Sequence, residues 1–149
     1  MKRVWIILAV VAVAAYVGGR NASVQPRPAV EVGAKQASDS NDAVAAAFGD
    51  HRSHVQVRGA GQVSRLLPDD NDGSRHQRFI LRMASGQTLL IAHNIDLAAR
   101  VDDLQVGDTV EFNGEYDWDP RGGVIHWTHH DPLARHASGW LRHDGRSYE

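Results

Sequence analysis

The chain of 149 residues contains no cysteine and only two lysines. Without cysteine there can be no disulfide bond, thiolate metal site, cysteine nucleophile or lipid attachment through an N-terminal cysteine. Any metal ion must therefore be held by nitrogen and oxygen ligands. Both lysines precede residue 41, so residues 41–149 carry eleven arginines against sixteen carboxylates, a formal net charge of −5. Because surfaces that bind polyanions are normally basic, this balance disfavours nucleic acid as a partner.

An apolar run follows two basic residues at the N-terminus. Lys2 and Arg3 precede residues 4–17, which are 14 consecutive apolar residues, and this pattern is typical of an export signal. The run is shorter than the roughly 17–25 residues of a stable span, and the cleavage signal is weak, so a cleaved form and a form anchored in the inner membrane by residues 4–19 both remain open. We expect a periplasmic or secreted protein that touches the membrane only through this segment.

Composition divides the chain into three parts. Residues 1–19 are the predicted signal peptide or anchor, and residues 41–149 are the predicted domain. Between them, residues 20–40 contain two prolines and few large apolar residues, which predicts a flexible linker because little surface can be buried there.

The domain is predicted to begin with a short helix. Asp39, Ser40 or Asn41 can serve as its N-cap, and the helix should run from Asp42 to about Phe48 and end at Gly49. Its apolar residues should pack against the domain. They are Val44, Ala47 and Phe48.

The remaining pattern predicts a mainly β fold. Alternating or apolar segments bounded by turn residues predict five strands, and the glycines of Gly59-Ala60-Gly61 predict a bend or bulge in the first. The predicted segments are residues 55–63, 77–83, 88–93, 108–115 and 123–128. A short helix is expected between the third and fourth, within residues 95–104. This is the plan of a five-stranded, OB-like Greek-key barrel. An immunoglobulin-like sandwich, the main alternative, needs about seven strands.

Several segments of the domain together resemble an uncharacterised bacterial family of small exported proteins marked by a His-Trp-Thr-His sequence. These segments are residues 67–70, 76–81, 91–97, 122–129 and 139–141. The resemblance covers about Val57 to Tyr148 and implies a domain of unknown function for which no catalytic residue is established.

Two histidine-bearing segments are candidates for a binding site. If Ser85-Gly86 forms a two-residue hairpin loop, Arg78 lies opposite His93, and His76 lies on the same outer face. The opposite face is then the core face. It would carry Phe79, Leu81, Met83 and Leu90.

The second candidate is the segment from His126 to Asp131. Imidazole binds transition metals and titrates near neutral pH, so His126, His129, His130 and Asp131 are candidate ligands for a divalent transition metal such as zinc. Alternation along a strand points His126 and His129 to opposite faces, so they can share an ion only if the strand breaks at or after Thr128. The alternative is that these imidazoles are structural or merely exposed.

These patterns favour a non-enzymatic binding domain for an unidentified ligand of the cell envelope. The predicted binding residues are His76, Arg78, His93, His126, Trp127 and His129. The alternative is a metal-dependent hydrolase, for instance a phosphoesterase, in which His126, His129 and Asp131 hold the ion and Glu115 acts as the base. The sequence does not decide between binding protein and enzyme, and no residue is predicted to be catalytic.

Overall fold

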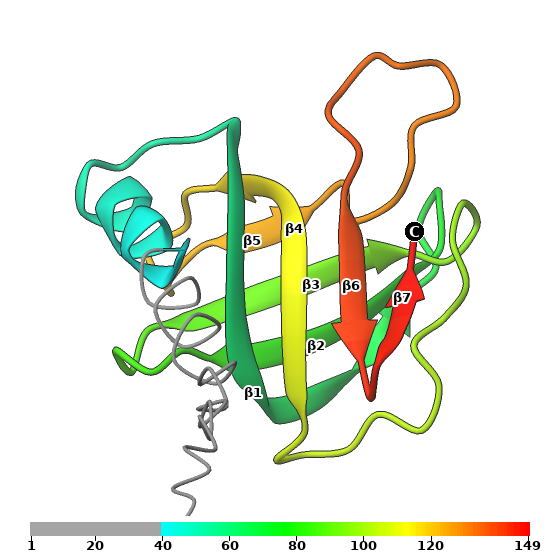
Figure 1. The fold of residues 1–149 in the computed structure, drawn as a ribbon, viewed down its shortest axis with the longest axis horizontal. Helices are drawn as coiled ribbons and strands as arrows, with labels where there is room; N and C mark the ends of the chain where they lie inside the picture. The colour runs from blue at the N-terminus through cyan, green and yellow to red at the C-terminus, as the bar shows by residue number, and fades with distance from the viewer. Residues whose placement is uncertain (1–39) are drawn as a thin grey trace, which may run out of the picture.

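The computed structural model describes residues 40–149, which form one seven-stranded sheet and a short helix (Figure 1). The helix spans residues 40–49. The strands are β1 (Val55–Asp70), β2 (His76–Arg82), β3 (Thr88–Asn94), β4 (Thr109–Asp117), β5 (Val124–His126), β6 (Trp140–His143) and β7 (Arg146–Tyr148). The predicted export segment and all but the last residue of the predicted linker lie outside the described residues. That last residue, Ser40, belongs to the helix. No helix within residues 40–149 is long and apolar enough to cross a membrane.

Five of the strands pair in a ring. The order is β1-β2-β3-β5-β4, and β4 pairs again with β1; β3 and β5 are parallel, whereas the other pairs in the ring are antiparallel. Figure 1 shows β4, β6 and the first half of β1 crossing in front of β2, β3 and β5. These five strands are those that the sequence predicts, and the protein is mainly β as expected.

The ring closes because β1 bends, as its glycines predict. Gln62 pairs with Thr109 of β4 and also with Arg82 of β2, so the strand changes partner at this residue. A Cβ atom on Gly61 would lie 2.9 Å from the Arg82 carbonyl oxygen, a separation that only glycine permits. The register with β2 then shifts between Val63 and Arg65, which is the expected irregularity.

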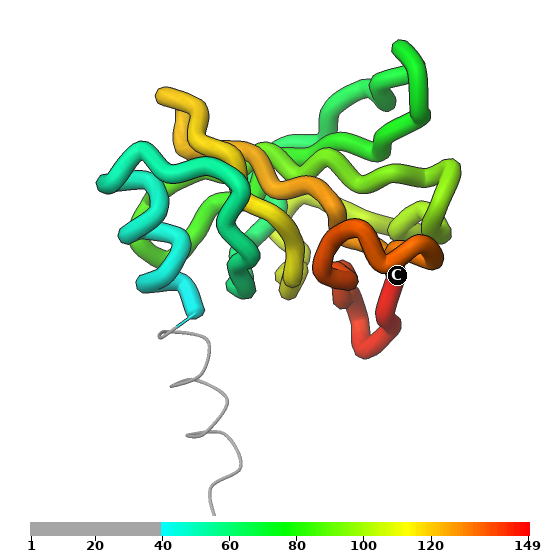
Figure 2. The backbone as a smooth tube through the Cα atoms, turned by 90° about the horizontal axis from the view of Figure 1, so that it is seen from above, coloured from blue at the N-terminus to red at the C-terminus, as the bar shows by residue number. Residues whose placement is uncertain are grey.

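The inward faces of the strands form one apolar core, and the helix covers one end of it. In the helix, Val44 and Ala47 are buried and Phe48 is half-buried against the core, as predicted. Asn41 caps no helix turn but accepts from the Ala60 N–H and donates to its carbonyl, tying the helix to β1. In Figures 1 and 2 the helix and the 127–139 loop lie toward opposite ends of the molecule.

The predicted register of the β2–β3 hairpin is wrong by one residue. The Met83 N–H donates to the Gln87 carbonyl, so the loop holds three residues and ends at Gly86 with φ of +88°. Gln77, not Arg78, therefore lies opposite His93. Because side chains alternate, His93 points into the core while His76 and Arg78 point outward, and Leu89 replaces Leu90 in the core.

The helix predicted between the third and fourth strands is absent, and residues 95–108 form successive turns. Side chains take the backbone groups that a helix would need. Asn94 Oδ1 accepts from the Asp96 N–H, and Asp108 Oδ2 accepts from the Gln105 N–H. The Gln77 amide both accepts from and donates to the backbone of Val101.

The sequence analysis also missed the last two strands, β6 and β7. They are short, and their hairpin turns at Asp144 and Gly145, both of which have positive φ as a type I′ turn requires. The dipeptide Asp-Gly is a strong signal for such a turn. β6 extends the sheet from β4 by pairing Leu141 with Phe112, so the sheet has seven strands although the ring has five.

Candidate metal centre

Three segments bring ionisable side chains together on the outer face of the ring. In β4, Tyr116 is buried in the core, so Glu115 and Asp117 on either side of it point outward. β5 pairs with β4 so that His126 lies opposite Glu115. His54 immediately precedes β1, and its backbone N–H donates to Asp117 Oδ1 over 3.0 Å. Strand pairing therefore places two imidazoles beside two carboxylates.

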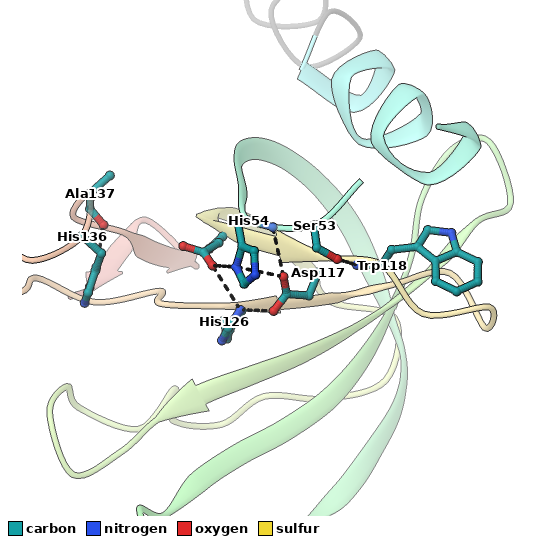
Figure 3. A network of polar contacts seen from close by, with 8 residues as sticks. Ser53, His54, Asp117, Trp118, His126, His136 and Ala137 are labelled. Atoms are coloured by element: carbon teal, nitrogen blue, oxygen red, sulfur yellow. Dashed lines mark hydrogen bonds and ion pairs between the residues drawn. The ribbon is translucent and has the colours of Figure 1, made fainter. Parts of the chain in front are cut away.

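The two carboxylates contact both rings. His54 Nδ1 lies 2.8 Å from Glu115 Oε1 and 3.5 Å from Asp117 Oδ1. His126 Nε2 lies 2.8 Å from Asp117 Oδ2 and 3.9 Å from Glu115 Oε1. Figure 3 shows the Asp117 carboxylate between His54 and His126, with dashed lines to each ring. These four residues are called the His54–His126 cluster below.

The His54–His126 cluster is open to solvent on one side. The side chain of His54 is 80% exposed, whereas those of Glu115, Asp117 and His126 are 21–31% exposed. The hydrogen bond with Glu115 and the charge of Asp117 raise the pKa of His54 above its usual value. Exposed ion pairs add little to stability, so these contacts alone do not account for the gathering of four such groups.

One buried nitrogen of the cluster lacks a hydrogen bond. His126 Nε2 is sealed from solvent and has no hydrogen-bond partner within residues 40–149. Although Asp117 Oδ2 is only 2.8 Å away, this contact does not have the geometry of a hydrogen bond. Trp118 Nε1 and His136 Nε2 are also unpartnered there. Of the three atoms, only His126 Nε2 faces two carboxylates that also contact a second imidazole.

The spacing of the donor atoms suits a metal ion. Zinc bonds of about 2.0–2.1 Å in a tetrahedron place ligand atoms about 3.3 Å apart. The four nitrogen–oxygen contacts of the cluster, from 2.8 to 3.9 Å, bracket that separation. Within residues 40–149, one group of three candidate ligands has atoms that all lie within 4.8 Å of one another, and it consists of His54, Glu115 and Asp117. His126 does not belong to this group but contacts both carboxylates from the neighbouring strand. Such a set of nitrogen and oxygen donors suits a divalent transition metal.

The His-Trp-Thr-His segment separates its residues instead of gathering them. β5 ends at His126, and Trp127 has a positive φ of 52°. The strand thus breaks one residue before the earliest position that the sequence suggested. As a result, His126 faces outward while Thr128 and His129 are buried.

Thr128 and His93 satisfy each other in the interior. His93 Nε2 lies 2.9 Å from the Ala99 carbonyl, which can only accept, so this nitrogen carries the proton. Nδ1 therefore accepts from the Thr128 hydroxyl, 2.8 Å away. Burial lowers the pKa of His93 to about 4. Because both nitrogens are occupied, His93 has no lone pair to offer a metal ion.

The other predicted metal ligands serve the 127–139 loop. His129 Nδ1 donates to the His130 carbonyl, and the exposed His130 contacts the Ser138 hydroxyl. The Asp131 carboxylate accepts hydrogen bonds from the backbone N–H groups of Leu133, Arg135 and His136. These bonds lower the pKa of Asp131, and the bond from Leu133 has the largest effect. The structure therefore does not bring His129, His130 or Asp131 to His126.

Residues 29–149 match the family described as Protein of unknown function (DUF3465). The chain belongs to this family. The expected membership of an uncharacterised family is thus confirmed, and it assigns no activity to any residue. No curated protein matches the chain.

The remaining predicted binding residues of this family member lie apart from the His54–His126 cluster or at its edge. His76 contacts the Ser74 carbonyl through Nδ1. Arg78 donates to the Pro68 carbonyl and lies outside the cluster. The Trp127 ring is 5.9 Å from that of His126 and 3.9 Å from that of His136, so it borders the cluster and covers the loop.

The sequence did not predict two residues of the cluster, and it suggested a different role for a third. Asp117 and His54 were not among the predicted site residues, and Glu115 was considered only as a base. The one available signal was the Glu-x-Asp spacing in a predicted strand, which places both carboxylates on one face. Nothing local marks His54, because it lies more than 60 residues before its partners.

Proposed function

We propose that this chain is an exported, OB-like binding domain that holds a divalent transition metal ion in the His54–His126 cluster. The observation that carries the proposal is the convergence of His54, Glu115 and Asp117 within 4.8 Å of one another, next to the buried, unpartnered Nε2 of His126. A metal ion accepts a lone pair from this nitrogen and balances the charge of Glu115 and Asp117. It thereby satisfies groups that are otherwise poorly paired.

The strand order supports an OB-like Greek-key barrel. A ring of five strands, a first strand shared between two neighbours and a parallel β3–β5 pair agree with that plan. In such a ring the ends of β4 and β5 and the segment entering β1 lie together, where the cluster is. Export is supported by Lys2 and Arg3 ahead of the apolar residues 4–17.

Binding, rather than a named reaction, is the function that this geometry supports. The donors come from β4, β5 and the residue before β1, and they are positioned by strand pairing. His54 lies on the open side, so an ion there keeps coordination positions for water or for a group of a ligand. A metal ion bound in this way also stabilises the fold, because it binds only the folded chain.

The test is metal binding by the full chain, purified without a histidine tag and stripped with a chelator. We expect about one equivalent of zinc, manganese or nickel to bind in calorimetry, and a metal at about 100 times its Kd to stabilise the fold by about 2.7 kcal/mol. Asp117→Asn and His126→Ala should each abolish saturable binding. His130→Ala, which removes an exposed imidazole of the neighbouring segment, should bind as the wild type does.

Two outcomes contradict the proposal. One is wild-type protein that binds none of the three metals and whose melting temperature they do not change. The other is binding that survives in Asp117→Asn and His126→Ala but is lost in His130→Ala, which would move the site to residues 129–131.

A further inference from the structure

A second concave site lies on the outer face of the ring, apart from the His54–His126 cluster. It is a groove of about 490 Å³ across β1, β2 and β3, bounded by the loop that joins β4 to β5. None of the four cluster residues lines it. Its volume lies within the range of small-molecule sites.

Strand register places three arginines around one aliphatic residue in this groove. Ile80 is central: Arg65 lies opposite it on β1, and Leu90 lies opposite it on β3. Arg78 and Arg82 are two residues away along β2, so they project from the same face. Diagonal neighbours on a sheet are about 7–8 Å apart, within reach of a long side chain. The guanidinium groups can therefore converge over Ile80 and Leu90.

Two of these three arginines have no counter-charge among the residues that the structure describes. Arg65 and Arg82 make no ion pair or side-chain hydrogen bond within residues 40–149. Arg78 is only loosely balanced, with Asp70 Oδ2 3.6 Å from its Nη1. Arg121 on the rim differs, because Asp119 accepts hydrogen bonds from both its Nε and Nη2. Unbalanced positive charge thus gathers in this groove, although residues 41–149 are acidic overall.

The groove offers no surface for stacking bases. Its lining side chains are arginine, aliphatic and small polar residues with one aspartate, and none is aromatic. Sites for single-stranded nucleic acid normally combine positive charge with aromatic platforms. Guanidinium forks match phosphate oxygens, and several of them suit a dianion better than a singly charged carboxylate. The aliphatic floor suits an uncharged body attached to that dianion.

We propose that this groove binds a small phosphate monoester. Arg65 and Arg82 hold the phosphate group, and Ile80 and Leu90 contact the uncharged part of the ligand. The site does not depend on the metal ion, because no cluster residue lines the groove.

The experiment uses phenyl phosphate as the probe, with excess chelator present so that no metal ion contributes. We expect saturable binding by the full chain in calorimetry. Loss of one charge-assisted hydrogen bond weakens affinity about tenfold to a hundredfold, so Arg65→Gln and Arg82→Gln should each show a loss in that range. Arg146→Gln removes one exposed arginine of β7, outside the groove, and should retain affinity within about twofold. Asp117→Asn should leave the affinity unchanged, which separates this proposal from the metal site.

Binding measurements with other ligands identify the source of the phosphate group. Benzoate, with the same ring and a single carboxylate, should bind more weakly than phenyl phosphate, and inorganic phosphate should bind more weakly because it lacks the apolar body. Absence of phenyl phosphate binding, or equal affinity in the Arg65→Gln/Arg82→Gln double variant, overturns the proposal. So does Arg65-dependent binding of phosphatidylglycerol vesicles or oligothymidylate without binding of phenyl phosphate, because the partner is then a membrane or a nucleic acid.

Discussion

Histidines serve opposite purposes in two neighbouring regions of this protein. In the His54–His126 cluster the imidazoles face carboxylates from another strand, and one buried ring nitrogen has no hydrogen-bond partner within the described residues. In the interior, both nitrogens of His93 are occupied by the Ala99 carbonyl and the Thr128 hydroxyl. The difference shows that the partner atoms, not the number of imidazoles, separate a candidate ligand from a structural residue.

The largest expected effect on stability concerns His93, the structural histidine of the interior. His93→Ala should lower the free energy of unfolding by about 3 kcal/mol, because it leaves a cavity and removes the partner of the buried Thr128 hydroxyl and of the Ala99 carbonyl. Urea denaturation measures this change. His76→Ala, at an outward position on the neighbouring strand, should cost less than about 0.5 kcal/mol. Equal effects of the two substitutions would mean that His93 is not a structural element of the core.

The second effect is a dependence of stability on pH. The pKa of His93 is about 4 in the folded protein, against about 6.5 in an unfolded chain. Between these values the unfolded state binds more protons, so stability falls as the pH is lowered from 6.5 through 4. At pH 5 the loss from this residue is about 2 kcal/mol. Urea denaturation at pH 7 and pH 5 measures it, and His93→Gln should reduce the difference by that amount. An undiminished difference in this variant would assign the acid sensitivity to other groups.

The smallest expected effect on stability concerns His54, a candidate metal ligand of the His54–His126 cluster. His54 is mostly exposed, so His54→Ala should change the stability of the metal-free protein by less than about 0.5 kcal/mol. Partners that only support a ligand are worth tenfold to a hundredfold in metal affinity, so loss of a direct ligand should cost at least about tenfold. Calorimetry with zinc measures the affinity, and His51→Ala is the matched control for an exposed histidine. Unchanged affinity in His54→Ala would restrict the metal site to the other three residues.

Local patterns predicted much of the fold, but they failed where register or distant partners decide. Alternation located the five strands of the ring, and Gly61 marked the bend of β1. The predicted register of the β2–β3 hairpin was wrong by one residue, because composition alone does not distinguish a two-residue loop from a three-residue loop. This error in register reversed the expected orientation of His93, because successive side chains of a strand point to opposite faces of the sheet.

Local sequence patterns predicted even less of the candidate site than of the fold. The segment from His126 to Asp131 was singled out, yet only His126 belongs to the cluster. The backbone turns at Trp127, where φ is positive, and this turn sends the following imidazoles into the interior and the loop. No sequence pattern favoured that conformation for a tryptophan, which rarely adopts it.

By itself, the sequence determined the β-rich character of the domain, the helix before it, the membership of the family and the exclusion of thiolate chemistry. These properties depend on residue types and on periodicity within a few neighbours. The tertiary structure decided which imidazoles meet carboxylates and which arginines share a groove. Those encounters depend on pairing between distant strands, as for His54 with Glu115 and Arg65 with Ile80. A shift of a single residue in such a pairing exchanges the buried and exposed faces.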